Sequence, residues 1–381
     1  MNLLDVYPLW EIEPVKGAGC KIWDKTGKEY LDLYGGHAVI SIGHSHPVYT
    51  QMLKDQLDKI GFYSNAVQNG LQREMAQKLG ELCGYPGYSL FLCNSGAEAN
   101  ENALKLASFH TGRKKILALE NAFHGRTSGA VEATDNPRIQ AEFNKNSNVV
   151  FVPINNPEAA RQELEKEEYA AFILEGIQGV AGIYTPTTSY LLKIRELCNQ
   201  TGTLLIFDEI QSGYGRSGKF FAHQHAGVTG DIISMAKGIA NGFPMGAIIT
   251  SPDIQATHGM LGTTFGGNHL ACTAAIAVLK VLKSEKLIDN ARETGRYIME
   301  NLQPYLGAGK PVKELRGTGL MIGIELNPGY ETFRNELLFE KNIFTGGAGK
   351  NIIRLLPPLS LTQQEAGTFL DAFKELADKK R

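Results

Sequence analysis

The chain has 381 residues, of which 43% are hydrophobic and 20% are charged, and its formal net charge is -2. This balance argues against a nucleic-acid or membrane-surface partner held by bulk charge, and no apolar run is long enough to span a bilayer. The five scattered cysteines form no CxxC pair, and the N-terminus lacks a basic segment followed by an apolar one, so we expect a cytoplasmic protein with reduced thiols and no signal peptide.

The first eighty residues predict a hairpin followed by two helices. Residues 20–32 form the hairpin with its turn at residues 24–27, and the apolar spacing is helical over residues 47–60 and 70–83. Between these elements lie three histidines, His37, His44 and His46. No carboxylate or cysteine accompanies His44 and His46 in their Gly/Pro-bounded loop, so a structural loop is favoured there and no metal site is expected.

A strand predicted at residues 89–94 leads into Ser95, Gly96 and Ala97, and then into a helix that continues through Ala107. Ser95 and Glu98 match a capping box, which by itself explains both residues. The small side chains of Gly96 and Ala97 also leave the first N–H groups of the helix open to an anion. A strand, a small-residue turn and a helix N-terminus together can bind a phosphate group.

The alternation of strands and helices continues with strands predicted at residues 115–119, 149–153 and 170–174. After the first of these come Phe123, which can stack on an aromatic ring, and Arg126, which can bind a carboxylate through two hydrogen bonds. A core phenylalanine and a surface arginine would explain the same residues. The third strand ends at Glu175. Polar residues at successive strand ends indicate an α/β fold with a doubly wound parallel sheet and one active edge.

The strongest pair of residues in the chain is Asp208 and Lys237. Asp208 directly follows a strand predicted at residues 203–207, and Lys237 is the only charged residue between Ile232 and Ile249. A desolvated lysine loses its charge readily, and a neutral amine forms a Schiff base with a carbonyl group. Pyridoxal phosphate combines such a lysine with an acid on its ring nitrogen. The alternative is that Asp208 caps a helix and Lys237 reaches the surface.

The C-terminal third predicts a different architecture. After a segment at residues 246–250 we expect one long helix from Leu270 to about Leu306, then strands at residues 319–326 and 352–356 and a helix at residues 363–377. We therefore expect a large cofactor-binding α/β domain at residues 48–265 and a smaller, discontinuous α+β domain at residues 1–47 and 266–381. Arg354 lies in an apolar stretch, where it forms either a buried ion pair or a receptor for a carboxylate.

Five separated motifs, taken together and in this order, resemble those of class-III (ornithine-type) aminotransferases. They are Ser95–Asn100, Phe123–Thr127, Asp208–Gln211, Lys237–Gly238 and Gly262–Asn268. The resemblance implies a pyridoxal-phosphate enzyme with the aspartate-aminotransferase-like fold (fold type I), consisting of a large domain with a mostly parallel sheet flanked by helices and a smaller α+β domain. Within the family, the chain is similar to acetylornithine and succinylornithine aminotransferases.

The resemblance also implies a role for each motif residue. Lys237 would be the Schiff-base lysine and proton shuttle, with Asp208 on the ring nitrogen and Gln211 near the phenolic oxygen. The cofactor phosphate and the two ring faces would be contacted by Ser95, Gly96, Ala97, Phe123 and Ile210, and Glu175 would have an orienting role. Thr264 of a neighbouring subunit would complete the phosphate site, which implies a homodimer with shared active sites. Arg126, Arg354 and His37 would contact the substrate.

The implied reaction moves the δ-amino group of an N-acylornithine to 2-oxoglutarate, giving an N-acylglutamate 5-semialdehyde and glutamate in arginine biosynthesis. Other ω-amino substrates (ornithine, 4-aminobutyrate or succinyldiaminopimelate) and an aminomutase of the glutamate-semialdehyde type remain alternatives. Three departures concern the substrate: Val180 stands where the family has an acid that can pair with the arginine at Arg354, His37 replaces a tyrosine or an aliphatic residue, and residues 66–69 lack an aromatic. We hypothesise that the missing acid and His37 favour an acyl group with its own carboxylate, namely succinyl.

Overall fold

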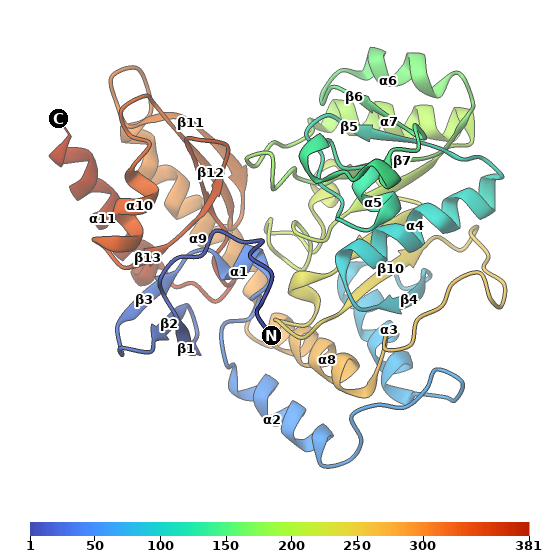
Figure 1. Cartoon of the computed structure of the whole chain (residues 1–381), viewed down its shortest axis with the longest axis horizontal. Helices are drawn as coiled ribbons and strands as arrows, with labels where there is room; N and C mark the ends of the chain where they lie inside the picture. Colours follow the sequence, from blue (N-terminus) through green and yellow to red (C-terminus); the bar gives the residue numbers. More distant parts are fainter. Residues whose placement is uncertain (381) are drawn as a thin grey trace.

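A seven-stranded sheet forms the centre of the larger lobe in the computed structural model, which describes residues 1–380 (Figure 1). Only β10 runs antiparallel to its neighbours, and the other pairings in the sheet are parallel. The order across the sheet is β4 (Ser89–Cys93), β10 (Gly246–Thr250), β9 (Ile232–Met235), β8 (Leu204–Asp208), β7 (Tyr169–Glu175), β5 (Lys115–Leu119) and β6 (Val149–Val152).

Both faces of this sheet are buried, which explains why its strands are continuous apolar runs in the sequence. Along β7, Phe172 and Leu174 belong to one hydrophobic cluster, whereas Ala171 and Ile173 belong to the other, on the opposite face. β7 and β8 are in parallel register, so that Glu175 lies opposite Asp208. Two acids predicted from separate strand ends therefore meet at one edge of the sheet.

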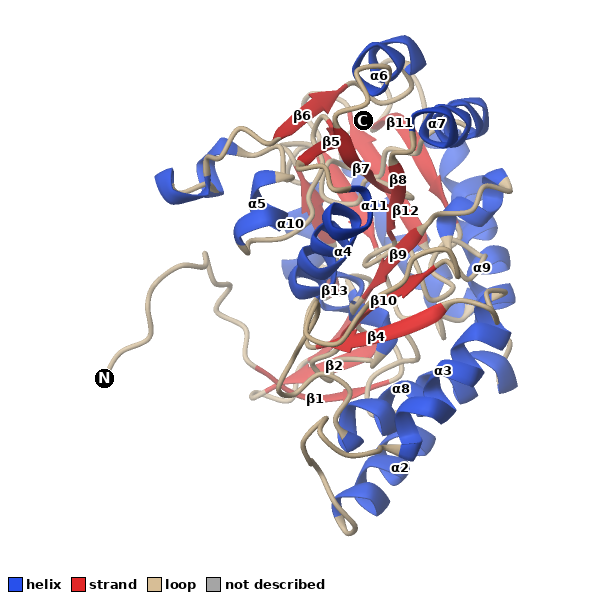
Figure 2. Cartoon of the chain, turned by 90° about the vertical axis from the view of Figure 1, so that its right-hand side faces the viewer, coloured by secondary structure: helices blue, strands red, loops and turns tan. Residues whose placement is uncertain are grey.

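Helices cover the two faces of the sheet (Figure 2). α4 (Gly96–Thr111) packs along β7, β9 and β10, and its N-cap Ser95 forms the predicted capping box with Glu98. α6 (Pro157–Leu164) packs against α7 (Thr188–Thr201). α2 (Pro47–Leu57) and α3 (Gly70–Cys83) both pack against α8 (His269–Ser284) at the bottom of Figure 1.

A second lobe contains two four-stranded sheets, which are built from the N-terminal and C-terminal parts of the chain. The first sheet has the order β1 (Pro14–Ala18), β2 (Lys21–Asp24), β3 (Glu29–Asp32) and β13 (Ile343–Phe344), and includes the predicted hairpin. The second has the order β11 (Val312–Thr318), β12 (Met321–Leu326), β15 (Ile352–Leu355) and β14 (Gly346–Ala348). α9 (Leu287–Leu302), α10 (Phe333–Phe339) and α11 (Gln363–Lys379) complete this lobe.

The remaining helical segments are short. They are α1 (Gly35–Ala38), α5 (Ser128–Glu132) and the 3-10 turns η1 (Pro137–Ile139), η2 (Glu142–Asn144), η3 (Ala222–Ala226), η4 (Lys237–Ile239) and η5 (Gln303–Tyr305). None of the helices within residues 1–380 has the length and apolar character needed to cross a membrane.

The prediction of one long helix from Leu270 to about Leu306 was wrong. The helix breaks between α8 and α9, at Lys286, whose φ of 51° is in the left-handed region. Residues 283–286 are all polar, so this turn has no apolar side chain to bury, and the apolar face resumes at the buried Leu287. The predicted fold class is confirmed, whereas the predicted domain boundaries, which place residues 48–265 in one domain and residues 1–47 and 266–381 in the other, remain a proposal.

Candidate active site

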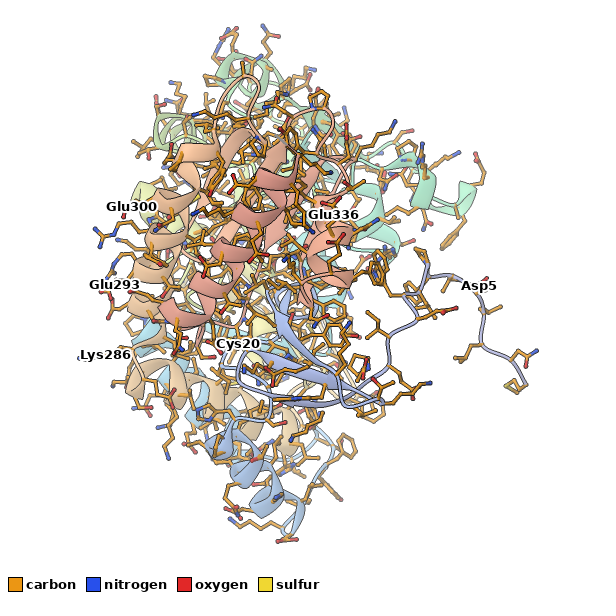
Figure 3. All side chains as sticks on the ribbon, turned by 90° about the vertical axis from the view of Figure 1, so that its left-hand side faces the viewer. Asp5, Cys20, Lys286, Glu293, Glu300 and Glu336 are labelled. Carbon is orange, nitrogen blue, oxygen red and sulfur yellow. The ribbon has the colours of Figure 1, made fainter. Side chains whose placement is uncertain are left out.

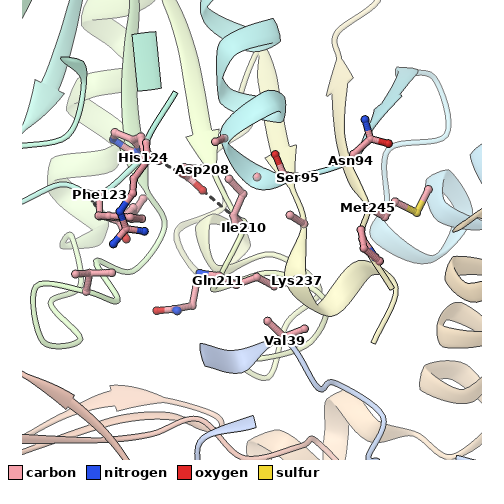
Figure 4. Close-up of a pocket in the computed structure, with 18 of the residues that line it drawn as sticks. Val39, Asn94, Ser95, Phe123, His124, Asp208, Ile210, Gln211, Lys237 and Met245 are labelled. Atoms are coloured by element: carbon pink, nitrogen blue, oxygen red, sulfur yellow. Dashed lines mark hydrogen bonds and ion pairs between the residues drawn. The ribbon is translucent and has the colours of Figure 1, made fainter. Parts of the chain in front are cut away.

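A cavity of about 380 Å³ lies beside the carboxyl ends of β7 and β8 (Figure 4). Ten of the thirteen residues that were assigned a site role from the sequence line it, whereas His37, Thr264 and Arg354 are not among its lining residues. The ten are Ser95, Gly96, Ala97, Phe123, Arg126, Glu175, Asp208, Ile210, Gln211 and Lys237. Sequence motifs that are separated by more than a hundred residues therefore meet around one space.

The Asp208 carboxylate is buried and fixed by three hydrogen bonds. Its Oδ2 accepts from His124 Nδ1 at 2.7 Å and from Asn100 Nδ2 at 2.8 Å, and its Oδ1 accepts from the backbone N–H of Ile210 at 3.0 Å. Figure 4 shows the contacts with His124 and Ile210 as dashed lines. Ser234 Oγ donates to Asn100 Oδ1 at 2.6 Å, which orients the Asn100 amide toward Asp208. Asp208 is thus held in one position at the cavity wall.

The backbone at Lys237 has a strained conformation, and hydrogen bonds to the residues that follow it stabilise this conformation. Its φ of 48° lies in the left-handed region, which is costly for a residue with a side chain and which persists where surrounding contacts enforce it. Here Ser41 Oγ donates to the carbonyl of Gly238 at 2.9 Å, and Tyr49 Oη donates to that of Ala240 at 2.9 Å. Burial lowers the pKa of Lys237 to about 8, and Arg354 adds to this effect, although Asp208 and Glu175 oppose it.

Asn241 ties the Lys237 loop to the segment before α2. Its side-chain Oδ1 accepts from the backbone N–H of Ser41 at 2.8 Å and of Ile42 at 3.0 Å, and its Nδ2 donates to the carbonyl of Gly43 at 3.0 Å. Asn241 is itself in the left-handed region, with φ of 48°. The two segments are about two hundred positions apart in the chain, and these three hydrogen bonds fix one against the other.

Glu175 and Gln211 form the next part of the wall. The Glu175 carboxylate accepts from the backbone N–H of Phe123 at 3.1 Å and of Gly179 at 3.0 Å. Burial raises the pKa of Glu175 to about 7, although His124 opposes the shift, and Asp208 adds to it. Gln211 Nε2 donates to the carbonyl of His37 at 3.1 Å, whereas the buried Gln211 Oε1 has no partner within residues 1–380.

The N-terminus of α4 presents free donors to the cavity. α4 is 16 residues long, and the first N–H groups of a helix have no acceptor within it. A Cβ atom on Gly96 would lie 2.9 Å from Ile210 Cδ1, so only glycine lets the two segments approach this closely. Backbone donors, the partial positive charge of the helix end and the Ser95 hydroxyl together suit an anion such as phosphate.

Two arginines without an acidic partner lie around the cavity. Arg126 is exposed, and its guanidinium carbon lies 5.4 Å from the centre of the Phe123 ring. Arg354 is 5% exposed, and its Nη1 donates to the carbonyl of Gly179 at 2.9 Å. Burial lowers the pKa of Arg354. Its Nε has no partner and no carboxylate pairs with it in the described part of the chain, so the alternative of a buried ion pair finds no support.

His37 lies on an unusual left-handed turn. Gly35, Gly36, His37 and Ala38 all have φ between 55° and 67°, and the imidazole of His37 hydrogen-bonds to the Tyr34 hydroxyl. Burial lowers the pKa of His37 to about 4, and Lys237, Arg354 and Arg126 add to the shift, so the ring is neutral at neutral pH.

The neighbouring histidines have structural partners. His44 Nε2 lies 2.8 Å from Asp32 Oδ2, and His46 Nε2 lies 2.9 Å from Glu285 Oε1. Across residues 1–380 no cluster of three histidine, cysteine or acidic side chains is arranged to bind a metal ion.

Sequence reasoning gave no role to His124, Asn100 or Asn241. His124 lies inside the Phe123–Thr127 motif, so its position in that motif was an available signal. Asn100 is the last residue of the Ser95–Asn100 motif, which was a signal of the same kind, whereas Asn241, four residues after Lys237, carries no local pattern. Thr264 is exposed on its own chain and does not line the cavity.

Comparison with known proteins connects this geometry to one family. The family model described as aminotransferase class-III matches residues 6–376. An acetylornithine aminotransferase of Bacillus cereus is 41% identical over 367 residues, which cover 96% of this chain and 94% of that protein.

Two solved structures extend the comparison. One is an acetylornithine aminotransferase from Elizabethkingia anophelis, with a TM-score of 0.86 and 30% identity, covering 99% of this chain and 96% of that one. The other is an ornithine aminotransferase from Toxoplasma gondii, described as having PLP at its active site. Its TM-score is 0.90 and its identity 30%, and the match covers 99% of this chain and 93% of that one.

Proposed function

This chain belongs to the class-III aminotransferases, and on that basis we propose that it uses pyridoxal phosphate to move the δ-amino group of an N-acylornithine to 2-oxoglutarate. The products are an N-acylglutamate 5-semialdehyde and glutamate, and the pathway is arginine biosynthesis. The observation that carries the proposal is the joint placement of Lys237, Asp208 and the α4 N-terminus around one cavity. An aminotransferase activity on acetylornithine is named for the Bacillus cereus relative.

The residues of the cavity fit the cofactor. The free N–H groups of Gly96 and Ala97, with the Ser95 hydroxyl, would bind its phosphate. Asp208 would accept a hydrogen bond from the protonated ring nitrogen, and the unpartnered Gln211 Oε1 is free to meet a polar ring substituent. Phe123 and Ile210 supply aromatic and aliphatic surfaces for the two ring faces. When bound, pyridoxal phosphate supplies an aldehyde and a ring that accepts electrons from the reacting carbon of the substrate.

The protein residues then bind, orient and exchange protons. The pKa of Lys237, about 8, is close to neutral pH, so its amine can both accept and return a proton at the carbon that carries the amino group. Three hydrogen bonds keep Asp208 ready to retain the proton on the ring nitrogen. Arg126 and Arg354 would each receive a substrate carboxylate, which fixes the reacting carbon relative to Lys237.

We further propose a homodimer in which Thr264 contacts the phosphate in the partner's site. Two exposed rings support an interface near this loop: Phe265 is 60% exposed and Phe62 is 43% exposed, and their centres lie 5.5 Å apart. Asn65 Nδ2 donates to the carbonyl of Gly266 at 3.0 Å, which joins the two loops into one surface. Sedimentation analysis would test the dimer, and Thr264→Ala should weaken cofactor binding if the contact crosses between subunits.

The acyl group has two candidates. The names of the relatives favour acetyl. Succinyl is favoured by Arg354, which has no acidic partner in residues 1–380, while Val180, the residue after its acceptor Gly179, carries no charge. A succinyl group would bring a second carboxylate to a site with two unpaired guanidinium groups.

The test is a half-reaction on the purified protein loaded with pyridoxal phosphate and free of 2-oxoglutarate. N-acetylornithine, N-succinylornithine, ornithine and 4-aminobutyrate are mixed in separately, and the loss of the cofactor absorbance band is followed. We expect rapid loss with one N-acylornithine and slow loss with the other amines. Reaction with none of the four would refute the proposed function, and turnover without 2-oxoglutarate would indicate an aminomutase.

A further inference from the structure

A second, smaller pocket lies between the N-terminal segment and α10. Its volume is about 90 Å³, and no step of the proposed reaction uses its residues. The lining residues are Trp10, Tyr34, Arg334, Leu338, Phe344 and Thr345. Residues 1–9 extend away from the body of the protein, as the position of Asp5 in Figure 3 shows, and Trp10 is where the chain meets α10, with its ring centre 5.1 Å from that of Phe339.

Arg334 brings an unbalanced positive charge to this pocket. Its Nε donates to the carbonyl of Thr345 at 3.3 Å, and its guanidinium carbon lies 5.7 Å from the centre of the Trp10 ring. No carboxylate within residues 1–380 forms an ion pair with it. Arg316, in the same lobe, pairs with both Glu314 and Glu325. A guanidinium group with free N–H donors in a pocket is suited to a planar anion.

Thr345 supplies a second, independent sign of a ligand. It is 5% exposed, and its buried hydroxyl oxygen has no hydrogen-bond partner in the part of the chain that the structure describes. Buried polar groups are nearly always paired, because leaving one unpaired costs about 1–3 kcal/mol. A ligand oxygen in the pocket would accept a hydrogen bond from the Thr345 hydroxyl and remove this cost.

Two glycines of β14 shape the pocket wall. A Cβ atom on Gly346 would lie 2.8 Å from Cε2 of Tyr34, and one on Gly347 would lie 3.0 Å from Nη1 of Arg334. The absence of side chains lets the tyrosine ring and the guanidinium group lie against the strand. The position of Arg334 is therefore set by packing on three sides, namely Trp10, Gly347 and the Thr345 carbonyl.

We propose that the Arg334 pocket binds a small aliphatic monocarboxylate. The carboxylate accepts hydrogen bonds from the Arg334 guanidinium and the Thr345 hydroxyl, and the short alkyl part contacts Leu338 and Phe344 beneath the Trp10 ring. The volume suits a ligand of the size of acetate or propionate. Arg334 also lies close enough to Arg354 to lower its pKa, so an anion in the pocket reduces the positive potential at the candidate active site.

Trp10 provides the measurement, because the chain has only two tryptophans. In a Trp23→Phe variant of the full-length, cofactor-loaded protein, Trp10 is the only source of tryptophan emission. Titration with sodium acetate or propionate, at ionic strength held constant with sodium chloride, should give a saturable change in emission. Chloride alone should give none. Isothermal titration calorimetry of the unsubstituted protein provides the same comparison if Trp23→Phe impairs folding.

Matched variants locate the site. Arg334→Gln should weaken carboxylate binding at least about tenfold, since it removes a charge-assisted bidentate contact. Thr345→Val, which keeps the shape but not the hydroxyl, should weaken it less. Arg138→Gln, at an exposed arginine without an ion pair, and Arg354→Gln should leave the emission change intact.

The proposal would be overturned by the absence of a saturable response, by an equal response to chloride, or by an unchanged affinity in Arg334→Gln. Loss of the response in Arg354→Gln would also overturn it, because the carboxylate would then be bound at the candidate active site. The measurement requires no turnover, so its failure would leave the proposed transamination untouched.

Discussion

The lowered pKa of Lys237 predicts a pH dependence for the capture of pyridoxal phosphate. With a pKa of about 8, roughly 9% of the amine is neutral at pH 7 and about half at pH 8. A lysine at its ordinary pKa of 10.5 would be about 0.03% neutral at pH 7. Burial therefore raises the concentration of the reactive amine by about 300-fold at pH 7.

The assay is the rate at which the cofactor-free protein acquires the absorbance band of bound pyridoxal phosphate, measured between pH 6.5 and pH 10. Because only the neutral amine attacks an aldehyde, the rate should rise about fivefold from pH 7 to pH 8 and then level off above about pH 9. The phosphate group of the cofactor titrates near pH 6, below this window. Lys237→Ala gives the background from exposed lysines.

A second variant tests the cause of the shift. Glu175 raises the pKa of Lys237, so Glu175→Gln should move the midpoint of the profile below that of the unsubstituted protein. A rate that keeps rising to pH 10 would refute the argument, since the amine would then be solvated. An unchanged rate in Lys237→Ala would refute the assignment of the lysine.

Three further outcomes follow from the geometry. Gly96→Ala places a Cβ 2.9 Å from Ile210 and should weaken pyridoxal phosphate binding about tenfold by equilibrium dialysis, whereas Gly87→Ala, which meets no neighbour, should not. Asn241→Ala removes three backbone contacts and should lower the free energy of unfolding in urea by about 2–3 kcal/mol. The pKa of Glu175 is about 7 in the folded protein and 4.5 in the unfolded chain, so the folded protein binds more protons between these two pH values. As pH rises from 4.5 to 7, the free energy of unfolding should therefore fall relative to that of Glu175→Gln.

The central sheet was predictable because both of its faces are covered. Strand β5 occupies the residues predicted for it, since a strand buried on two sides is an uninterrupted apolar run bounded by polar residues. The break at Lys286 was not predictable in the same way. Apolar residues keep helical spacing on both sides of it, and the turn depends on how α8 and α9 pack against different partners.

The pairing of Asp208 with Lys237 at one cavity was predictable for a different reason. Asp208 comes at the end of an apolar strand and Lys237 lies inside an apolar segment, and charged residues in such places stand out in a sequence. Asn100 and His124 lie inside motifs, but an asparagine in a helix and a histidine in a loop are ordinary residue types, so the sequence does not indicate what they contact. Their importance lies in contacts with Asp208 across 108 and 84 positions, which only the folded chain brings together.

The charges around the cavity couple the binding of an anionic substrate to the basicity of Lys237. Arg354 contributes to lowering the pKa of Lys237, whereas Asp208 and Glu175 oppose that shift. A carboxylate bound at Arg354 would cancel part of the positive charge that Lys237 experiences. The amine then becomes a stronger base at the moment when the substrate is in place, while in the empty site it remains neutral enough to react with an aldehyde. In the proposed reaction, Arg354 would thus serve both substrate binding and the timing of proton transfer, without any movement of the backbone.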